Sequence, residues 1–251
     1  MEAAQRHQLV GQWLEERGEV TVAGLAEATG VSEMTMRRDL EHLERSGLLR
    51  RVHGGAVAVS RSFELPFGAR LAVADEAKQK IGAAVAGMLE PGETVLLDGG
   101  TTAYAVGAAL PESACLTVCV LNLHVAEAIQ DRPGIRLLVP GGEARPGELS
   151  LTGQLTLAAI GGLNFDTYVL TVGGIDATAV TEFHLDDTAV KQAGLRSARR
   201  TVIAASGNKV GRRAFATVTA DLAGLTLVTD GSADAGVLDA LRDRGMTVVT
   251  V

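Results

Sequence analysis

The stretch SEMTMRRDL, residues 32–40, has the pattern of an amphipathic helix with a capping residue at its start. Ser32 opens the stretch, and a serine hydroxyl at this position accepts a hydrogen bond from a backbone N–H group of the first helical turn. Met36, Leu40 and Leu43 follow at i, i+4 and i+7, which places them on one apolar face. Two adjacent arginines fall outside that face. The stretch therefore predicts a helix that buries one side and presents basic side chains on the other.

The residues before this helix complete a helix-turn-helix pattern. Residues 4–16 carry apolar side chains at helical spacing, and Gly18 follows as a stop. Residues 20–31 predict a second, short helix that ends at Gly30, a residue suited to a left-handed cap. In a helix-turn-helix the second of the two paired helices enters the major groove of DNA. We therefore predict that residues 1–57 form a winged helix-turn-helix domain that binds double-stranded DNA.

The predicted wing is the stretch LLRRVHGGAVAV, residues 48–59, in which apolar and basic residues alternate around Gly54-Gly55. Arginine reads guanine through paired donors, and basic side chains on a wing meet phosphates or the minor groove. Solvation of an exposed helix face is the alternative role for the arginine pair. The residues predicted to contact DNA are Ser32, Glu33, Thr35, Arg37, Arg38, Arg50, Arg51 and His53.

Charge is balanced across this region, although the whole chain carries a formal net charge of −7. Residues 1–61 contain eight basic and nine acidic side chains. DNA affinity must therefore come from the placement of charge and not from its total. Asp39 lies among the basic residues and would repel the DNA backbone, so we expect it to hold an arginine within the domain.

The composition of the 251 residues is that of an ordinary globular protein, with 47% apolar and 21% charged residues. There is no run of 18 or more apolar residues and the first residues are polar, so we expect a cytoplasmic protein. Cys115 and Cys119 lie in an apolar stretch and are expected to be buried thiols, too far apart on a strand to form a disulfide. No cluster of metal ligands is apparent, and no cofactor is expected.

The chain changes character after a segment without clear periodicity, residues 58–75, which we interpret as a linker. From residue 76 onward helical stretches alternate with apolar strands, which is typical of an α/β domain with a mainly parallel sheet. We therefore predict a larger domain over residues 76–251. The predicted strands are residues 94–98, 116–121, 135–140, 167–172, 201–206, 225–230 and 247–251.

The sequence LLDGGTTAYAVGAAL, residues 96–110, predicts a strand, a glycine turn and the start of a helix. Gly99 and Gly100 allow close approach of a ligand, and the N–H groups and hydroxyls of Thr101 and Thr102 then form an anion site at the helix start. A plain strand–helix turn is the alternative. Other strand-end loops should converge on the same crevice, and two lysines are candidate positive charges there. These further candidates are Asn122, Gly141, Gly142, Asp176, Lys191 and Lys209.

The N-terminal pattern resembles the helix-turn-helix of the DeoR family of bacterial sugar-operon regulators. The resemblance covers residues 6–57 and rests on Arg6, Val10, Leu14, Ser32, residues 35–40 and the wing at residues 47–56.

Residues 76–251 resemble the effector-sensing domain of the same family, which is similar in fold to ribose-5-phosphate isomerase and glucosamine-6-phosphate deaminase. The resemblance implies that Asp98 belongs to a phosphate loop with residues 100–102, and that the effector is a phosphorylated sugar or a related metabolite. Further matching positions are Lys80, Ile81, Asn122, Pro140, Gly141, Gly142, Glu143, Gly153, Gly174, Ile175, Asp176, Lys191, Lys209, Gly211, Thr229 and Asp230.

Four positions depart from the family pattern and remove polar groups from loops that should line the pocket. Leu121 and Leu123 flank Asn122 where the family usually has threonine and serine. Ala179 replaces a glycine, and Ser206 replaces an aspartate. The usual sugar specificity is therefore not transferable to this chain.

Three functions are open at this point. The leading hypothesis is a repressor of a carbohydrate operon that a phosphorylated sugar releases from DNA, with a homodimer or homotetramer supplying two DNA-binding heads. The first alternative is an aldose–ketose phosphate isomerase with a DNA-binding head, in which Asp176 and Lys191 would handle protons. The second alternative is an interaction module that binds no small molecule. The strand-end loops contain fewer carboxylates than the active-site loops of such isomerases, which argues against the enzyme.

Overall fold

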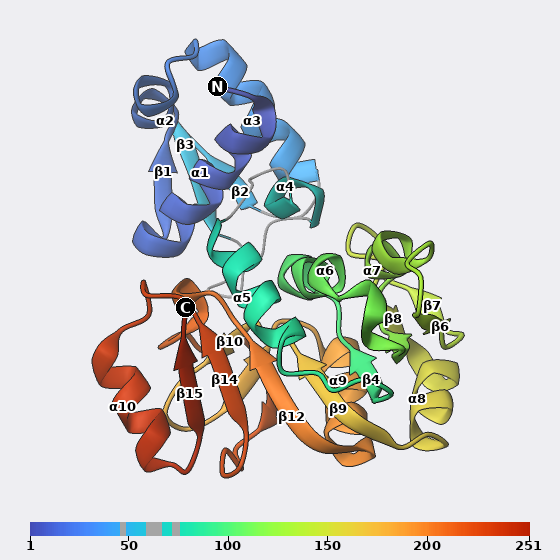
Figure 1. Cartoon of the computed structure of the whole chain (residues 1–251). Coiled ribbons are helices and arrows are strands. Elements are labelled where there is room, and N and C mark those ends of the chain that lie inside the picture. The colour runs from blue at the N-terminus through green and yellow to red at the C-terminus, as the bar shows by residue number, and fades with distance from the viewer. Residues whose placement is uncertain (46–48, 59–66, 72–75) are drawn as a thin grey trace. The chain divides into compact units, whose positions relative to one another are not determined.

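The structure is a computed structural model that describes residues 1–45, 49–58, 67–71 and 76–251 (Figure 1). The chain divides into two compact units, residues 1–74 and 75–251. No helix within the described ranges is both long and apolar enough to cross a membrane.

The N-terminal unit combines helices with a small antiparallel sheet in the strand order β1-β3-β2. The predicted helices and the two-stranded wing are confirmed. The sequence did not predict β1, which pairs with β3 and widens the wing to three strands. The elements are α1 (Ala3–Arg17), β1 (Glu19–Thr21), α2 (Val22–Thr29), α3 (Glu33–Arg45), β2 (Leu49–Val52), β3 (Gly55–Ala58) and α4 (Phe67–Leu71).

Local signals in the sequence set the boundaries of these helices. Gly18 ends α1 and Gly30 ends α2, both in the left-handed conformation, with φ of 76° and 67°. The Ser32 hydroxyl accepts a hydrogen bond from the Thr35 N–H at 3.2 Å and so caps α3, as predicted. The predicted apolar face of α3 is also confirmed, because Met36, Leu40 and Leu43 are all buried in the core of the unit.

Part of the predicted linker, residues 58–75, is helical. Ala58 ends β3, and residues 67–71 form α4 within the N-terminal unit. The rest of the predicted linker, residues 59–66 and 72–75, lies outside the described residues.

The C-terminal unit is built on a seven-stranded sheet in the order β15-β14-β12-β9-β4-β5-β6, in which every neighbouring pair is parallel. Each of the strands predicted for this domain is present in the sheet. The strands are β4 (Thr94–Leu97), β5 (Thr117–Val120), β6 (Arg136–Leu138), β9 (Phe165–Leu170), β12 (Ala198–Ala204), β14 (Thr226–Thr229) and β15 (Thr247–Thr250).

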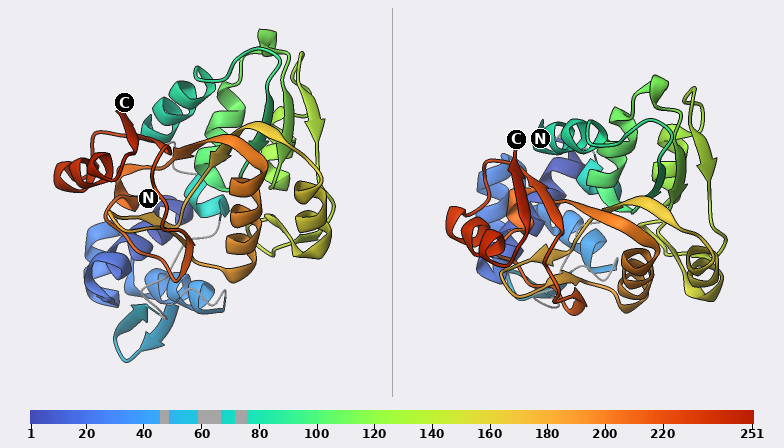
Figure 2. Two further views of the ribbon diagram at one scale, coloured as in Figure 1. Left: turned by 90° about the horizontal axis from the view of Figure 1, so that it is seen from below. Right: turned by 60° about the horizontal axis from the view of Figure 1, so that its bottom comes forward.

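Helices cover both faces of this sheet (Figure 2). Side chains alternate across a strand, so neighbouring residues of β4 enter different cores. Leu97 belongs to the core that includes residues of α5, α6 and α7, and Leu96 belongs to the core that includes residues of α8, α9 and α10. The helices are α5 (Glu76–Ala86), α6 (Gly100–Ala109), α7 (Leu123–Ile129), α8 (Gly153–Gly161), α9 (Leu185–Ser197) and α10 (Ala235–Asp243).

Short elements surround the main sheet, and the sequence did not predict them. Two small antiparallel sheets are formed by strands of only two to four residues, too short to show a hydrophobic period. Their members are β7 (Glu143–Ala144) with β8 (Leu151–Thr152), and β10 (Gly174–Ile175) with β11 (Val180–Glu182) and β13 (Ala216–Thr219). Single-turn 3₁₀ helices occur at Glu112–Ala114 and Gly207–Lys209.

The two cysteines occupy different environments. Cys119 is buried in β5, as expected, and burial raises the pKa of its thiol to about 11. Cys115 is exposed, so the expectation of a buried thiol is wrong there. It follows a 3₁₀ turn with a φ of 49°, which places it before the strand and not within it.

Candidate DNA-binding and effector sites

The start of α3 presents most of the side chains that the sequence predicted to meet DNA. Glu33, Arg37 and Arg38 are exposed, and Thr35 is half-buried. Arg37 donates to Glu33 at 3.1 Å. No hydrogen bond or ion pair holds Arg38 among the residues that the structure describes. The guanidinium of Arg38 is therefore available at the first turns of α3, where a recognition helix contacts base edges.

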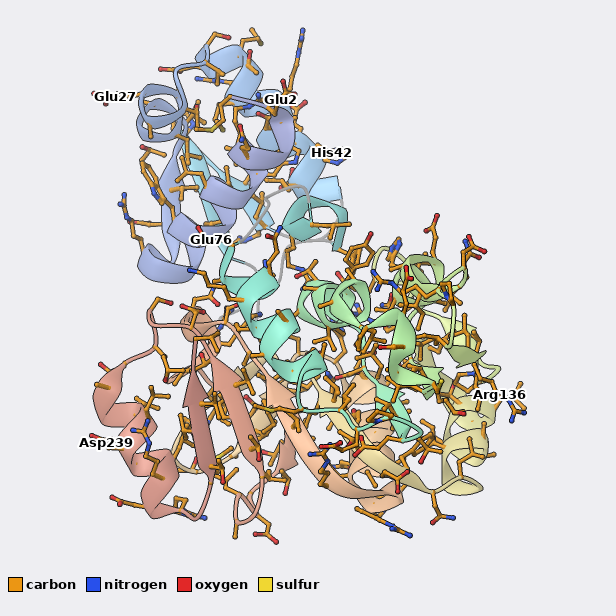
Figure 3. The ribbon with its side chains drawn as sticks, in the orientation of Figure 1. Glu2, Glu27, His42, Glu76, Arg136 and Asp239 are labelled. Carbon is orange, nitrogen blue, oxygen red and sulfur yellow. The ribbon has the colours of Figure 1, made fainter. Side chains whose placement is uncertain are left out.

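Asp39 is withdrawn from this surface by two side chains of α1. It accepts hydrogen bonds from Arg6 at 2.6 and 3.2 Å and lies 3.2 Å from His7 Nε2. The expectation that Asp39 holds an arginine is confirmed. The hydrogen bond to Asp39 raises the pKa of Arg6. His7 in turn stacks on His42, which projects from α3 (Figure 3).

The three predicted wing residues are all exposed, but they differ in their contacts. Arg51 donates to Glu41 and Glu44, both on α3. The side chains of Arg50 and His53 have no hydrogen bond or ion pair within the described part of the chain. The wing therefore offers Arg50 and His53 to solvent, and it uses the Arg51 side chain inside the domain.

In the C-terminal unit the turn after β4 begins α6 in an unusual conformation. Gly99 is the N-cap and Gly100, the first helical residue, has a φ of 87°, a left-handed value that favours glycine. Thr101 and Thr102 are buried. The first N–H groups of a helix have no partner within the helix. The turn thus places the first backbone N–H groups of α6 beside two buried threonines, and the anion site stays a prediction.

Asn122 connects this turn to the loop after β5. A Cβ atom on Gly99 would lie 3.1 Å from Asn122 Nδ2, so a larger residue at position 99 would require the Asn122 side chain to shift by a few tenths of an ångström. Asn122 Oδ1 accepts hydrogen bonds from His124 N and Val125 N and so caps α7, and its Nδ2 donates to Glu148 O at 2.8 Å. The side chain of Asn122 therefore organises the loops around the predicted site.

Lys191 is buried in a cluster of charges behind the same turn. Its Nζ donates to Asp98 Oδ2 at 2.6 Å and to Thr171 O at 2.8 Å, and it lies 3.0 Å from Glu182 Oε2. Burial by itself would lower the pKa of Lys191, but the adjacent Asp98 and Glu182 carboxylates outweigh it and raise the pKa. The three acceptors match the three donors of an ammonium group. Lys191 therefore contacts the predicted phosphate turn through Asp98.

Thr171, at the end of β9, completes the connection. Its N–H and hydroxyl donate to Asp98 Oδ2 at 2.9 and 3.0 Å, and its hydroxyl lies 2.7 Å from Gly99 O. Sequence reasoning missed both Thr171 and Glu182. A carboxylate within the apolar stretch AVTEF was the available signal for Glu182, because buried charges occur mainly where they are paired.

A second ion pair lies one helical turn before Lys191. Asp187 accepts from Ser150 Oγ at 2.8 Å and pairs with Arg145 Nε at 3.0 Å. Arg145 and Ser150 belong to a turn that also carries Glu148, the partner of Asn122. A network of contacts thus runs from α9 through this turn to the loop after β5.

Gly141 and Gly142, predicted as ligand contacts, pack against α8. Thr156 donates to Gly141 O at 2.8 Å. A Cβ on Gly142 would lie 2.0 Å from Thr156 Oγ1 and 2.6 Å from Thr152 O. Close packing of the backbone on α8 therefore explains the glycine at residue 142.

Asp176 and Lys209 lie around β10 and β11. Asp176 pairs with Arg213 at 2.9 Å. Burial would raise the pKa of Asp176, but hydrogen bonds from Thr178 and Ala179 outweigh it and lower the pKa. Lys209 Nζ lies 5.1 Å from the ring centroid of Phe183, the residue after Glu182. Direct contacts among the predicted residues therefore join Asp98, Gly99, Asn122 and Lys191, while Asp176 and Lys209 belong to the flanking loops.

Comparison with known proteins identifies the family of both units. Residues 6–62 match the family model of the DeoR-like helix-turn-helix domain, and residues 73–231 match that of the DeoR C terminal sensor domain. The chain belongs to the DeoR family.

Relatives of this DeoR-family protein cover nearly its whole length. It is 31% identical over 245 residues to the glycerol-3-phosphate regulon repressor of Escherichia coli K12, which covers 97% of each chain. It is 29% identical to the HTH-type transcriptional repressor CsqR of the same strain, over 97% of this chain and 94% of the relative. Ribose 5-phosphate isomerase A from Methanocaldococcus jannaschii aligns with 50% of each chain at 12% identity and a TM-score of 0.36.

The DeoR-family protein is therefore a DNA-binding transcriptional regulator, with operator DNA as its partner, and not an enzyme. Its fold is an N-terminal helix-turn-helix unit followed by an α/β unit with a parallel sheet of seven strands. The two relatives at 31% and 29% identity are both named repressors, and they give the isomerase alternative no support.

Proposed function

We propose that this DeoR-family regulator acts in the cytoplasm as the repressor of an operon for carbohydrate metabolism, and that a phosphorylated sugar or a related phosphoester relieves repression. The observation that carries the proposal is the left-handed start of α6 at Gly100, followed by the buried Thr101 and Thr102. Backbone N–H groups at a helix start, with the positive end of the helix dipole, favour a phosphate.

Lys191 limits the negative charge behind the turn. Asp98 directly precedes the turn, and its carboxylate would repel a phosphate if it were unpaired. Lys191 Nζ lies 2.6 Å from Asp98 Oδ2 and 3.0 Å from Glu182 Oε2, so it offsets part of the charge of this carboxylate pair. A relative at 31% identity is named the glycerol-3-phosphate regulon repressor, which favours a phosphoester as the ligand class.

The DNA-binding surface in this proposal is the start of α3 together with the wing. Ser32 caps the helix, and Glu33, Thr35, Arg37 and Arg38 face the major groove, while Arg50 and His53 meet phosphates. Reading two half-sites requires two heads, so the proposed functional unit is a homodimer or a homotetramer.

A thermal-shift titration with phosphoesters tests the ligand. Glycerol 3-phosphate and hexose phosphates are compared with their unphosphorylated counterparts. A ligand at a hundred times its Kd stabilises the folded state by about 2.7 kcal/mol, so the Tm should rise with one phosphoester and not with its dephosphorylated form. The same phosphoester should release the protein from its operator.

The variant Thr101→Val is the matched test of the site, because valine keeps the shape and removes the hydroxyl. It should bind operator DNA like the wild type and lose the release by phosphoester. A normal release in this variant would contradict the proposed site. A wild-type protein that responds to no phosphoester would contradict the proposed ligand class.

A further inference from the structure

Arg51 and two glutamates of the recognition helix form a clamp between the wing and α3. The Arg51 Nε donates to Glu44 Oε2 at 2.8 Å, and its Nη1 donates to Glu41 Oε1 at 2.7 Å. The backbone N–H of Arg51 also donates to Glu44 Oε1 at 2.8 Å. Glu44 thus holds both the main chain and the side chain of one wing residue.

The register of β2 explains why Arg51 reaches α3 and Arg50 does not. Successive side chains of a strand point to opposite faces. Leu49 is buried in the core of the unit, and Arg51, two residues later, continues the same face at its margin. Arg50 projects from the other face and is exposed. The two adjacent arginines therefore have different surroundings, although the sequence presents them as a pair.

The charge balance opposes a DNA contact by Arg51. Two carboxylates surround one guanidinium, so a move of Arg51 to a phosphate would break its hydrogen bonds with Glu44 and Glu41 and would remove the cation beside two carboxylates. Hydrogen bonds to Glu44 raise the pKa of Arg51, and the reciprocal hydrogen bonds from Arg51 lower the pKa of Glu44, so both groups stay charged in the clamp.

We propose that Arg51 is a positioning residue, which ties the wing to the recognition helix, and that its neighbour Arg50 contacts a phosphate. The clamp sets the angle between β2 and α3, and so the placement of Arg50 when α3 lies in the major groove. This inference rests on the established DNA binding and is independent of the effector.

Salt dependence of DNA affinity distinguishes a phosphate contact from a positioning role. The full-length protein is titrated with a duplex that the wild type selects from genomic DNA, at several salt concentrations. Arg50→Gln should reduce the slope of log K against log salt concentration by about one, the effect of one lost phosphate contact. Arg51→Gln should leave the slope unchanged and weaken binding about two- to fivefold at each salt concentration, the range for an exposed ion pair.

Two further variants, Arg51→Lys and Glu44→Gln, separate the effect of the Arg51 charge from the effect of its hydrogen bonds. Lysine keeps the positive charge but lacks the planar guanidinium, whose separate N–H groups donate to Glu44 and Glu41. Arg51→Lys should therefore bind DNA as weakly as Arg51→Gln. Glu44→Gln should also weaken binding, by about two- to fivefold, because it removes an ion-pair partner of Arg51. If Arg51 contacted phosphate instead, Glu44→Gln would strengthen binding through loss of a negative charge near DNA.

The proposal is overturned by a reduced slope for Arg51→Gln, by wild-type affinity in Arg51→Gln, or by tighter binding of Glu44→Gln. Thermal unfolding of each variant by circular dichroism confirms that the N-terminal unit is folded. Glu44→Gln changes neither side-chain size nor helix propensity much, so it remains informative if an Arg51 variant unfolds.

Discussion

Arg38 and Arg37 are adjacent in the sequence, yet their guanidinium groups are engaged differently. Arg37 donates to Glu33, one turn earlier on the same helix, and both side chains are more than half exposed. An exposed pair of this kind contributes little to stability and can open to meet DNA. Arg38 has no partner to release among the described residues. Arg38 can therefore contact a base without breaking a hydrogen bond, whereas Arg37 would first have to release Glu33.

Arg38→Ala is expected to weaken operator binding by about 1–3 kcal/mol, the range for an arginine that pairs with guanine. Fluorescence anisotropy at one fixed salt concentration measures the change, and substitution of single base pairs should show relaxed specificity at one position. Arg37→Ala is the comparison variant and should cost less, because Arg37 must give up its hydrogen bond to Glu33 before it can contact DNA. Unchanged affinity in Arg38→Ala would remove this residue from the set that reads bases.

At the scale of elements, Lys191 joins parts of the chain that are far apart in sequence. It lies on α9, Asp98 follows β4, and Glu182 ends β11. The Lys191 and Glu182 side chains are 7% and 8% exposed, so water screens this ion pair poorly. Removal of one member of a buried ion pair leaves an uncompensated charge in the interior, which is strongly destabilising.

Lys191→Met should lower the free energy of unfolding by about 3–5 kcal/mol, measured by urea denaturation. The control Lys80→Met removes the exposed partner of Glu76 on α5 and should cost less than about 0.5 kcal/mol.

The pH dependence of the stability lost in Lys191→Met shows whether an uncompensated buried charge causes that loss. The pKa of Lys191 is raised, so its stabilising effect is complete below the unfolded lysine value of about 10.4 and is lost only as the pH rises through the folded value. The wild type therefore keeps this contribution between pH 5 and 8. In Lys191→Met, protonation of a carboxylate replaces the missing cation, so the loss should be smaller at pH 5 than at pH 8. A small loss that does not vary with pH would rule out the uncompensated charge as its cause.

At the scale of the whole molecule, the proposed homodimer or homotetramer would bring two copies of α3 to DNA. The recognition helix of one chain covers one half-site, and operators of helix-turn-helix proteins carry half-sites about 10 base pairs apart or a multiple of that spacing. Sedimentation of the full-length protein should therefore give a dimer or a tetramer, and footprints should show paired half-sites. A monomer bound to one half-site would contradict the proposed assembly.

Short-range patterns in the sequence were enough to predict most of the architecture. The capped, amphipathic α3 and the seven apolar strands depend on periodicity within single elements, and the glycine turn after β4 depends on adjacent residues. Helix α8 and the two small sheets were not predicted, because threonines and glycines blur the helical period in GQLTLAAIG and the strands are too short to show one.

The sequence by itself determined which elements form and placed basic side chains on α3 and a glycine-rich turn before α6. Only the tertiary structure decided which of the charged residues remain available for a ligand. Arg51 and Lys191 looked like free cations in the sequence, but carboxylates from other elements engage both of them. The physical reason is that an ion pair depends on the distance between side chains after packing, and the Lys191 partner Asp98 lies 93 residues away along the chain.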